Sequence, residues 1–132
     1  MKPLVSALFV LILAACSKEP APVPAPADLR GQVEQAITQD RFEDALALLA
    51  PVDSTSAERT ELLYATHLTY GLFIMNNQSA GQMGKTMPQA LRHLRRALEL
   101  NPASEDARAN IALIEGIYNQ MGRPIPEGSA RP

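Results

Sequence analysis

The stretch that decides the fold is Ala90-Leu91-Arg92-His93-Leu94-Arg95-Arg96-Ala97-Leu98-Glu99-Leu100-Asn101-Pro102. Ala90, Leu94 and Ala97 recur at the spacing of one helical face, and Pro102 is placed to end that helix. A small residue lets one helix approach its partner closely, and a leucine one turn later fills the groove beside it. The pattern therefore predicts a helix that is packed tightly against a neighbour.

The same offsets recur earlier in the chain, at Ala45, Leu49 and Val52, although Ala57 stands where the second copy has Pro102. This order of residue types, a small residue, a large apolar residue, a second small residue and then a proline, resembles the second helix of a tetratricopeptide (TPR) repeat. The resemblance covers about residues 28 to 122, as two repeats plus one extra helix. It implies an all-α fold, a TPR-like α-solenoid of antiparallel helix-turn-helix repeats with about five helices. The alternative is a generic helical bundle in which the alanine spacing is accidental.

The apolar spacing between residues 28 and 123 is helical, without a useful run of strand-like alternation. We expect helices from Asp28 to near Gln39, from Asp40 to before Pro51, from Ser54-Thr55-Ser56 to about Asn76, after Pro88 to Pro102, and from Ser104 to Gly122. Capping-box spacing of Asp40 with Glu43, and of Thr55 with Glu58, predicts the starts of the second and third helices.

The two copies of the pattern are farther apart than the family period. Ala45 and Ala90 are separated by 45 residues, whereas a TPR repeat has about 34, so ~11 residues are inserted. The insertion falls between the third and fourth helices, over roughly Asn76 to Met87, where glycines and small polar residues predict a loop. Loops of this length are often functional, and the role of this one is left open.

Residues 1–15 have the order of an export signal, with Lys2, an apolar run and two small residues. From Leu4 to Ala15 the helix would span ~18 Å, too short for a hydrocarbon core of ~30 Å. Leu13-Ala14-Ala15-Cys16 resembles the lipobox of bacterial lipoproteins. The resemblance implies acylation of Cys16, attachment to the cell envelope and, because Ser17 follows, the periplasmic face of an outer membrane if the source has two. The alternative is an ordinary secretory signal with an incidental cysteine.

Residues 16–27 are predicted to be a tether. Four prolines occupy every second position from Pro20 to Pro26, which favours an extended polyproline spacer of ~3.1 Å per residue. A PxxP-type ligand is the functional alternative. Residues 28–123 form the predicted helical domain, and the composition of residues 124–132 predicts a disordered tail.

A partner-binding face follows from the resemblance, because the first helix of each TPR pair lines a concave surface. Transferred by the offsets, that face includes Ile37, Tyr64, Leu68, Leu72, Leu113 and Ile117. It is apolar, and Arg30 is its only nearby cation, so the expected partner is a hydrophobic protein segment or helix rather than a peptide carboxylate. The expected function is a membrane-anchored adaptor. The alternative is a self-associating structural accessory lipoprotein of a pilus, secretion or outer-membrane assembly complex.

Two further features admit two interpretations each. The third helix is apolar around most of its circumference, which means either that it is the middle helix, covered by the Met83 to Met87 segment, or that it carries an open apolar groove. The basic run at residues 92–96 is either a solvated face, with Arg95 paired to Glu99, or a contact for anionic lipid or an acidic partner.

Composition narrows the chemistry. Twelve Lys and Arg against 14 Asp and Glu give no basic excess for nucleic acid, and one cysteine excludes an internal disulfide and a Cys-based zinc cluster. His67 and His93 lie on different predicted helices without metalloprotease spacing, and no glycine-rich phosphate loop is present. We therefore expect no enzyme, catalytic residue, metal or cofactor.

Overall fold

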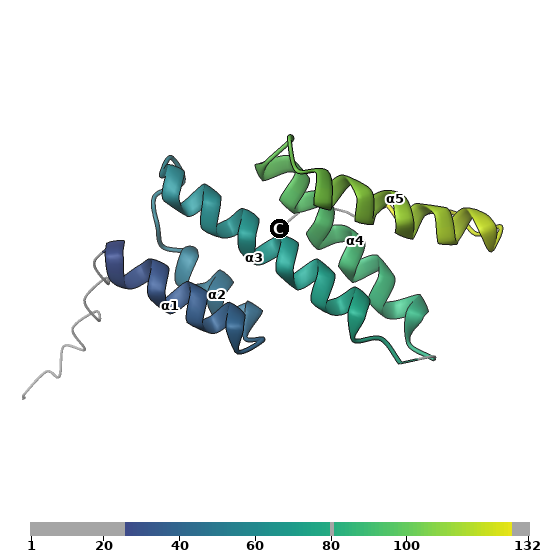
Figure 1. The fold of residues 1–132 in the computed structure, drawn as a ribbon, viewed down its shortest axis with the longest axis horizontal. Coiled ribbons are helices and arrows are strands. Elements are labelled where there is room, and N and C mark those ends of the chain that lie inside the picture. Colours follow the sequence, from purple (N-terminus) through teal and green to yellow (C-terminus); the bar gives the residue numbers. More distant parts are fainter. Residues whose placement is uncertain (1–25, 80, 128–132) are drawn as a thin grey trace, which may run out of the picture.

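The computed structural model describes residues 26–79 and 81–127. These residues form five α-helices and no strand (Figure 1): α1 Pro26–Thr38, α2 Phe42–Leu49, α3 Ala57–Asn76, α4 Met83–Leu100 and α5 Glu105–Gln120. The predicted all-α class is confirmed. The predicted signal peptide, Cys16 and the tether up to residue 25 lie outside the described residues. Within the described ranges, no helix has the length and apolar character needed to cross a membrane.

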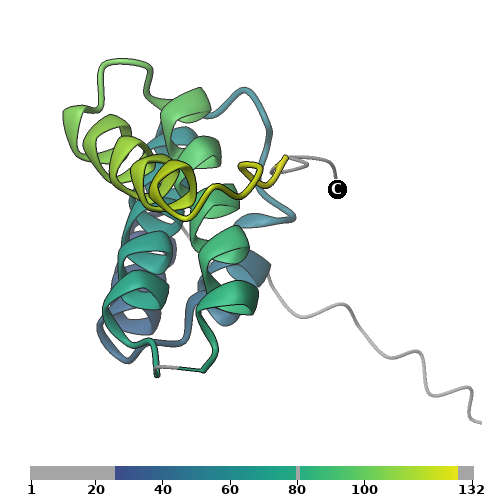
Figure 2. The same cartoon turned by 90° about the vertical axis from the view of Figure 1, so that its right-hand side faces the viewer.

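Each helix packs against the next one in the chain, and α1 also contacts α3. The most extensive interface joins α3 and α4, while α1 and α2 lie toward one end of the molecule and α5 toward the other (Figures 1 and 2). Because α1, α2 and α4 all pack against α3, its apolar residues are needed on several sides. The middle-helix interpretation accounts for the apolar circumference of α3.

The helices bury two groups of apolar side chains on either side of the middle of the fold. The N-terminal cluster contains Leu29, Val33, Ala36, Ala45, Leu49, Leu62 and Leu63. The C-terminal cluster contains Met87, Ala90, Leu91, Leu94, Ile111, Ile114 and Tyr118. Ala45, Ala90 and Leu94 are fully buried, as the packing pattern predicts.

The turn between α1 and α2 differs from the prediction. Asp40 does not cap α2, because its φ of 58° places it in the left-handed region. The amide of Arg41 donates to the carbonyl of Ala36, and that of Asp40 to Ile37, at 2.8 and 3.0 Å. This pair of bonds is a Schellman ending of α1, which occupies Asp40 and leaves α2 to begin at Phe42. The predicted box of Asp40 with Glu43 is therefore wrong.

The capping box of the third helix is also wrong, by one residue. Ser56 is the N-cap of α3 and accepts a hydrogen bond from the amide of Arg59. Thr55 instead donates through its amide and hydroxyl to the carboxylate of Asp53, each at 2.8 Å. The helix start is shifted because the Asp53 turn already uses Thr55. The Ser104 cap of α5 is found as predicted, with its Oγ accepting from the Ala107 amide.

The predicted loop from Asn76 to Met87 is wrong over its second half. The α4 helix begins at Met83, and Pro88 lies inside it. Pro88 has no backbone N–H, so α4 lacks the hydrogen bond that this amide would donate to the Gly84 carbonyl. Burial of Met87 in the C-terminal cluster offsets this cost and extends the helix.

Both boundaries of the predicted domain differ as well. Residues 26–27, assigned to the tether, belong to α1, since a proline is tolerated at the first helical position. Residues 124–127, assigned to the disordered tail, lie against the helices, with Ile125 packed on the C-terminal cluster and the Pro126 carbonyl accepting from Arg95 at 3.1 Å.

Gly71 lies where α3 packs tightly against α4. A Cβ atom built there would lie 2.8 Å from Leu94 Cγ and 3.3 Å from the Ala90 carbonyl oxygen, whereas one at Gly116 would meet nothing within 4 Å. We expect Gly71→Ala to destabilise the domain by about 1–2 kcal/mol, because overpacking outweighs the helix-propensity gain. Gly116→Ala, the matched control, should stabilise it by about 0.5–1 kcal/mol. Urea unfolding of both variants measures the difference, and equal stabilisation by both would contradict the close packing.

Candidate functional site

The six predicted groove residues do not share one open surface. Ile37 packs against the N-terminal cluster, while Leu68, Leu72 and Ile117 pack against the C-terminal cluster. Leu113 alone among the six is a strongly exposed side chain, at 56%. The other five residues are partly buried, so within this predicted face Leu113 on α5 is the most exposed side chain.

Tyr64 illustrates how a predicted binding residue becomes a structural one. Its hydroxyl lies 2.9 Å from the Oγ of Ser104, the N-cap of α5. Ser104 is buried and also accepts the Ala107 amide at 3.2 Å. Tyr64 thus connects α3 to the start of α5 through a partly buried hydrogen bond.

Arg30, the predicted cation near this face, has its charge satisfied within the domain. Its guanidinium lies 3.2 Å from the carboxylate of Glu58, 3.1 Å from Glu61 and 3.8 Å from Glu34. The hydrogen bond and charge of Glu61 make the largest contribution to a raised pKa of Arg30. The arginine joins α1 to α3 and is not presented to an anionic ligand.

The basic run on α4 is divided among several contacts. The predicted pair of Arg95 with Glu99 is wrong, because Arg95 pairs with Glu115 of α5 at 3.0 Å. Glu99 pairs instead with Arg96 at 2.7 Å, one turn away on the surface. Since two of the arginines have carboxylate partners and His93 is half-buried, the run does not form a uniform basic patch.

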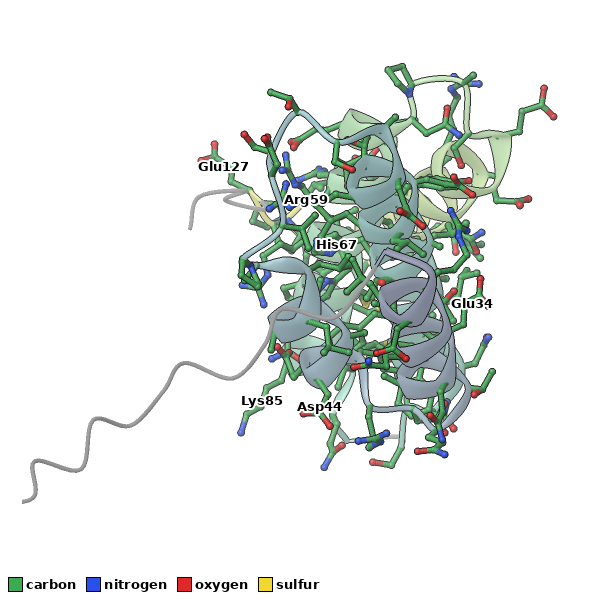
Figure 3. The ribbon with its side chains drawn as sticks, turned by 90° about the vertical axis from the view of Figure 1, so that its left-hand side faces the viewer. Glu34, Asp44, Arg59, His67, Lys85 and Glu127 are labelled. Carbon is green, nitrogen blue, oxygen red and sulfur yellow. The ribbon has the colours of Figure 1, made fainter. Side chains whose placement is uncertain are left out.

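The structure brings together two histidines that the sequence places 26 residues apart. The Nδ1 atoms of His67 on α3 and His93 on α4 lie 3.0 Å apart, within hydrogen-bond distance. Both histidines are half-buried; Figure 3 labels His67 near the middle of the view, and Glu34, Asp44 and Lys85, which are exposed, toward its edges. We call His67 and His93 the histidine pair.

A chain of side chains connects the histidine pair to α2. The rings of His93 and Tyr70 have centroids 4.2 Å apart, and Tyr70 stacks on Phe42 at 4.7 Å. The Tyr70 hydroxyl donates to Glu43 at 3.0 Å. Side chains from α2, α3 and α4 therefore meet around Tyr70. On the α2 side of this contact lies a pocket of about 270 Å³, lined by Asp40, Arg41, Phe42, Glu43, Asp44, Tyr70 and Phe73.

The surroundings keep the histidine pair neutral near pH 7. Burial lowers the pKa of His67 to about 4, with His93 and Arg96 acting in the same direction and Glu99 opposing them. Burial is also the main cause of a lowered pKa of His93, followed by Arg92 and opposed by Glu43. Neutral imidazoles can share one Nδ1 proton, but two imidazolium rings would present two donors to each other. The pair can act as a pH-sensitive joint between α3 and α4.

The spacing of the two histidines along the chain does not indicate this site, because they lie on different helices. The residues meet across an antiparallel interface whose register is set by Gly71 against Ala90 and Leu94. The only signal in the sequence is that both histidines fall on helices expected to pair. Within residues 26–79 and 81–127, no group of three His, Cys, Asp or Glu side chains is arranged to hold a metal ion.

A wider depression of about 540 Å³ lies between α1 and α2, lined by Gln32, Gln35, Ala36, Arg41, Asp44, Ala47, Leu48 and Pro51. It includes none of the six predicted groove residues.

Comparison with known proteins finds no matching family model, no matching curated protein and no matching solved structure.

Proposed function

We propose that the chain is a lipid-anchored, TPR-like adaptor of the bacterial cell envelope that binds a protein or peptide partner. The observation that carries the proposal is the succession of close helix contacts, in which α1 to α5 each pack on the next and α1 also reaches α3. Such a stack is typical of repeat folds, in which each helix pair buries its apolar face against its neighbour.

Small residues support the TPR-like part of the proposal. Gly71 leaves no room for a Cβ against Ala90 and Leu94, and Pro102 follows α4. The order glycine, alanine, large apolar residue and proline is that of the family pattern. Gly71 and Ala90 are separated by the end of α3, the connection at residues 77–82 and the first two turns of α4.

The exposed part of the predicted face suggests where a partner would bind. Leu113 lies on α5, the last helix of the stack, with Ala109 and Ala112 exposed beside it. The face that an inner helix would bury against the next repeat is open here. A hydrophobic segment or helix of a partner could take that place, and self-association through the same face is the alternative function.

The anchor is proposed from the sequence alone. The lipobox-like Leu13-Ala14-Ala15-Cys16 lies outside the described residues. Two or three acyl chains at ~0.8 kcal/mol per buried CH₂ would make attachment effectively permanent. The adaptor would then act at a membrane surface without a spanning helix.

The test is chemical crosslinking and affinity capture from the native envelope of the full-length protein, Cys16→Ala and Leu113→Glu. A defined partner lost with Leu113→Glu would support the adaptor. Ala103→Glu is the matched control, because it adds the same charge at an exposed turn outside that face. Leu68→Glu is unsuitable, since it would place a carboxylate beside the C-terminal cluster and unfold the domain.

The remaining outcomes separate the alternatives. Equal capture by Cys16→Ala would mean that the helical domain recognises the partner and the lipid sets only its location. Self-crosslinks alone, with a dimer by sedimentation, would favour the structural accessory lipoprotein. Capture that is unchanged by Leu113→Glu would exclude this face of α5.

A further inference from the structure

Methionine side chains gather where the start of α4 meets the end of α5. Met83 and Met87 are one turn apart on α4, and Met121 is the C-cap of α5. All three line one small pocket of about 60 Å³, together with Gly84, Tyr118 and Arg123. Met83, Gly84 and Met87 belong to the part of the predicted insertion that is helical in the structure.

Exposure distinguishes this corner from ordinary core packing. Met83 and Met121 are 43% and 47% exposed, whereas Met87 is 5% exposed and forms the inner end of the group. The two exposed side chains are flexible enough to close over an ion, and the inner one is held by the C-terminal cluster. Two of the three methionine side chains are thus exposed to solvent, and the third is buried at the inner end of the pocket.

Gln78 holds the inner sulfur in position. Its Nε2 donates to the Met75 carbonyl at 2.9 Å and lies 3.5 Å from Met87 Sδ. The Oε1 atom of Gln78 is buried without a hydrogen-bond partner among the described residues. The amide therefore acts as a positioning group behind Met87 rather than as part of a surface network.

We propose that Met83, Met87 and Met121 form a binding site for a soft monovalent cation, Cu(I). Thioether sulfur is a soft, neutral donor that prefers Cu(I) to hard or borderline ions such as Mg²⁺ and Zn²⁺. Binding at thioethers releases no proton, so it does not require a deprotonated thiolate or a high pH. The guanidinium of Arg123 opposes a cation at this pocket, but it is exposed and screened by water.

The site does not depend on the proposed adaptor function. It uses the α4 and α5 ends, away from Leu113 and from the histidine pair. Met87 packs in the C-terminal cluster whether or not a metal binds, whereas Met83 and Met121 are exposed. Leucine would fill the same space with nearly the same volume, so a requirement for sulfur is what an experiment must isolate.

Ag(I), a redox-stable substitute for Cu(I), is titrated into full-length protein labelled with ¹³C at the methionine methyl groups. All samples carry Cys16→Ser, because a free thiol would compete for the metal. We expect saturation at one equivalent, with the methyl signals of Met83, Met87 and Met121 shifted and that of Met75 unchanged. Zn(II) should leave all the signals in place. Competition with a chromophoric Cu(I) chelator then gives the Cu(I) affinity.

Met83→Leu and Met121→Leu should each weaken Cu(I) binding by about tenfold or more, while their thermal unfolding matches the parent protein. Met75→Leu, which is outside the pocket, is the matched control and should bind normally. Unchanged affinity of Met121→Leu, or no saturable binding at all, would overturn the proposal. Loss of binding in His67→Gln or His93→Gln alone would place the metal at the histidine pair and also overturn it.

Discussion

Leu94→Ala is expected to cost about 3 kcal/mol of unfolding free energy. Leu94 is fully buried in the C-terminal cluster, between α4 and α3, and lies against Gly71. Removing a buried leucine side chain costs about 2–5 kcal/mol, because the lost transfer free energy adds to that of the cavity. For a domain of this size the melting temperature should fall by roughly 10 °C or more. Urea and thermal unfolding measure both quantities.

Leu113→Ala is the matched control for this change. The same atoms are removed from a leucine that is 56% exposed on α5, so the expected cost is within about 0.5 kcal/mol. A comparable loss from both variants would mean that Leu113 is buried in the protein in solution, either against a partner or in a dimer. Sedimentation at two concentrations separates these two explanations.

A double-mutant cycle tests the contact between Leu94 and Gly71 directly. Gly71→Ala adds a methyl group 2.8 Å from Leu94 Cγ, which is unfavourable in the parent protein. In the Leu94→Ala background the same methyl group enters the cavity and should stabilise the domain. We therefore expect non-additivity of about 1–3 kcal/mol, and strictly additive effects would contradict the packing of α3 on α4.

The second large effect is a loss of stability on acidification through the histidine pair. The pKa of His67 is lowered from 6.5 to about 4 in the folded domain, and that of His93 is also lowered. As the pH falls, the unfolded chain takes up these protons first. The histidine pair therefore leaves the free energy of unfolding at its full value above about pH 6.5. It lowers that free energy progressively as the pH falls toward 4.

The size of this effect is limited by solvent. A pKa difference of this size would correspond to about 3 kcal/mol for a fully buried group. Because His67 is partly open to water, we expect about 1–2 kcal/mol from it, with a further contribution from His93. Urea unfolding at pH 7.5, 6.5, 5.5 and 4.5 measures the dependence.

Carboxylates also titrate at the lower end of this range, so the readout is a difference between proteins. In His67→Gln with His93→Gln, the fall in stability between pH 6.5 and 5.5 should largely disappear. The residual slope below pH 5 belongs to ion pairs such as Arg30 with Glu58 and Glu61. An identical slope in the parent protein and the double variant would exclude the histidine pair as the source.

The connections of Tyr70 give the acid response a route to α2. Its ring contacts His93 and Phe42, and its hydroxyl donates to Glu43. Burial and the bond to Glu43 raise the pKa of Tyr70, so the hydroxyl keeps its proton and the bond persists at neutral pH. Because the Tyr70 ring lies against His93, protonation of His93 would disturb the packing of Tyr70 on Phe42, which joins α3 and α4 to α2.

The helical class and most helix positions could be predicted because their signals are local. Spacing of three and four residues identifies a buried helical face, and Ser104 and Pro102 mark boundaries through their own backbone chemistry. Burial of Ala45, Ala90 and Leu94 follows from the same pattern. These features depend on residues within a few turns of one another.

Predictions failed where a distant contact overrode a local preference. The start of α4 moved to Met83 because Met87 is buried in the C-terminal cluster. Arg95 binds Glu115 on another helix instead of Glu99 on its own. Four of the six residues of the predicted partner-binding face also pack against the two clusters, which the local pattern did not indicate.

The sequence by itself determined that the described chain is helical and where its small residues pack. Only the tertiary structure placed His67 against His93 and Met121 beside Met83 and Met87. The physical reason is register. Periodicity specifies which face of a helix is buried, whereas the contact of Gly71 with Ala90 and Leu94 sets how far α4 slides along α3, and therefore which polar and sulfur-bearing side chains meet.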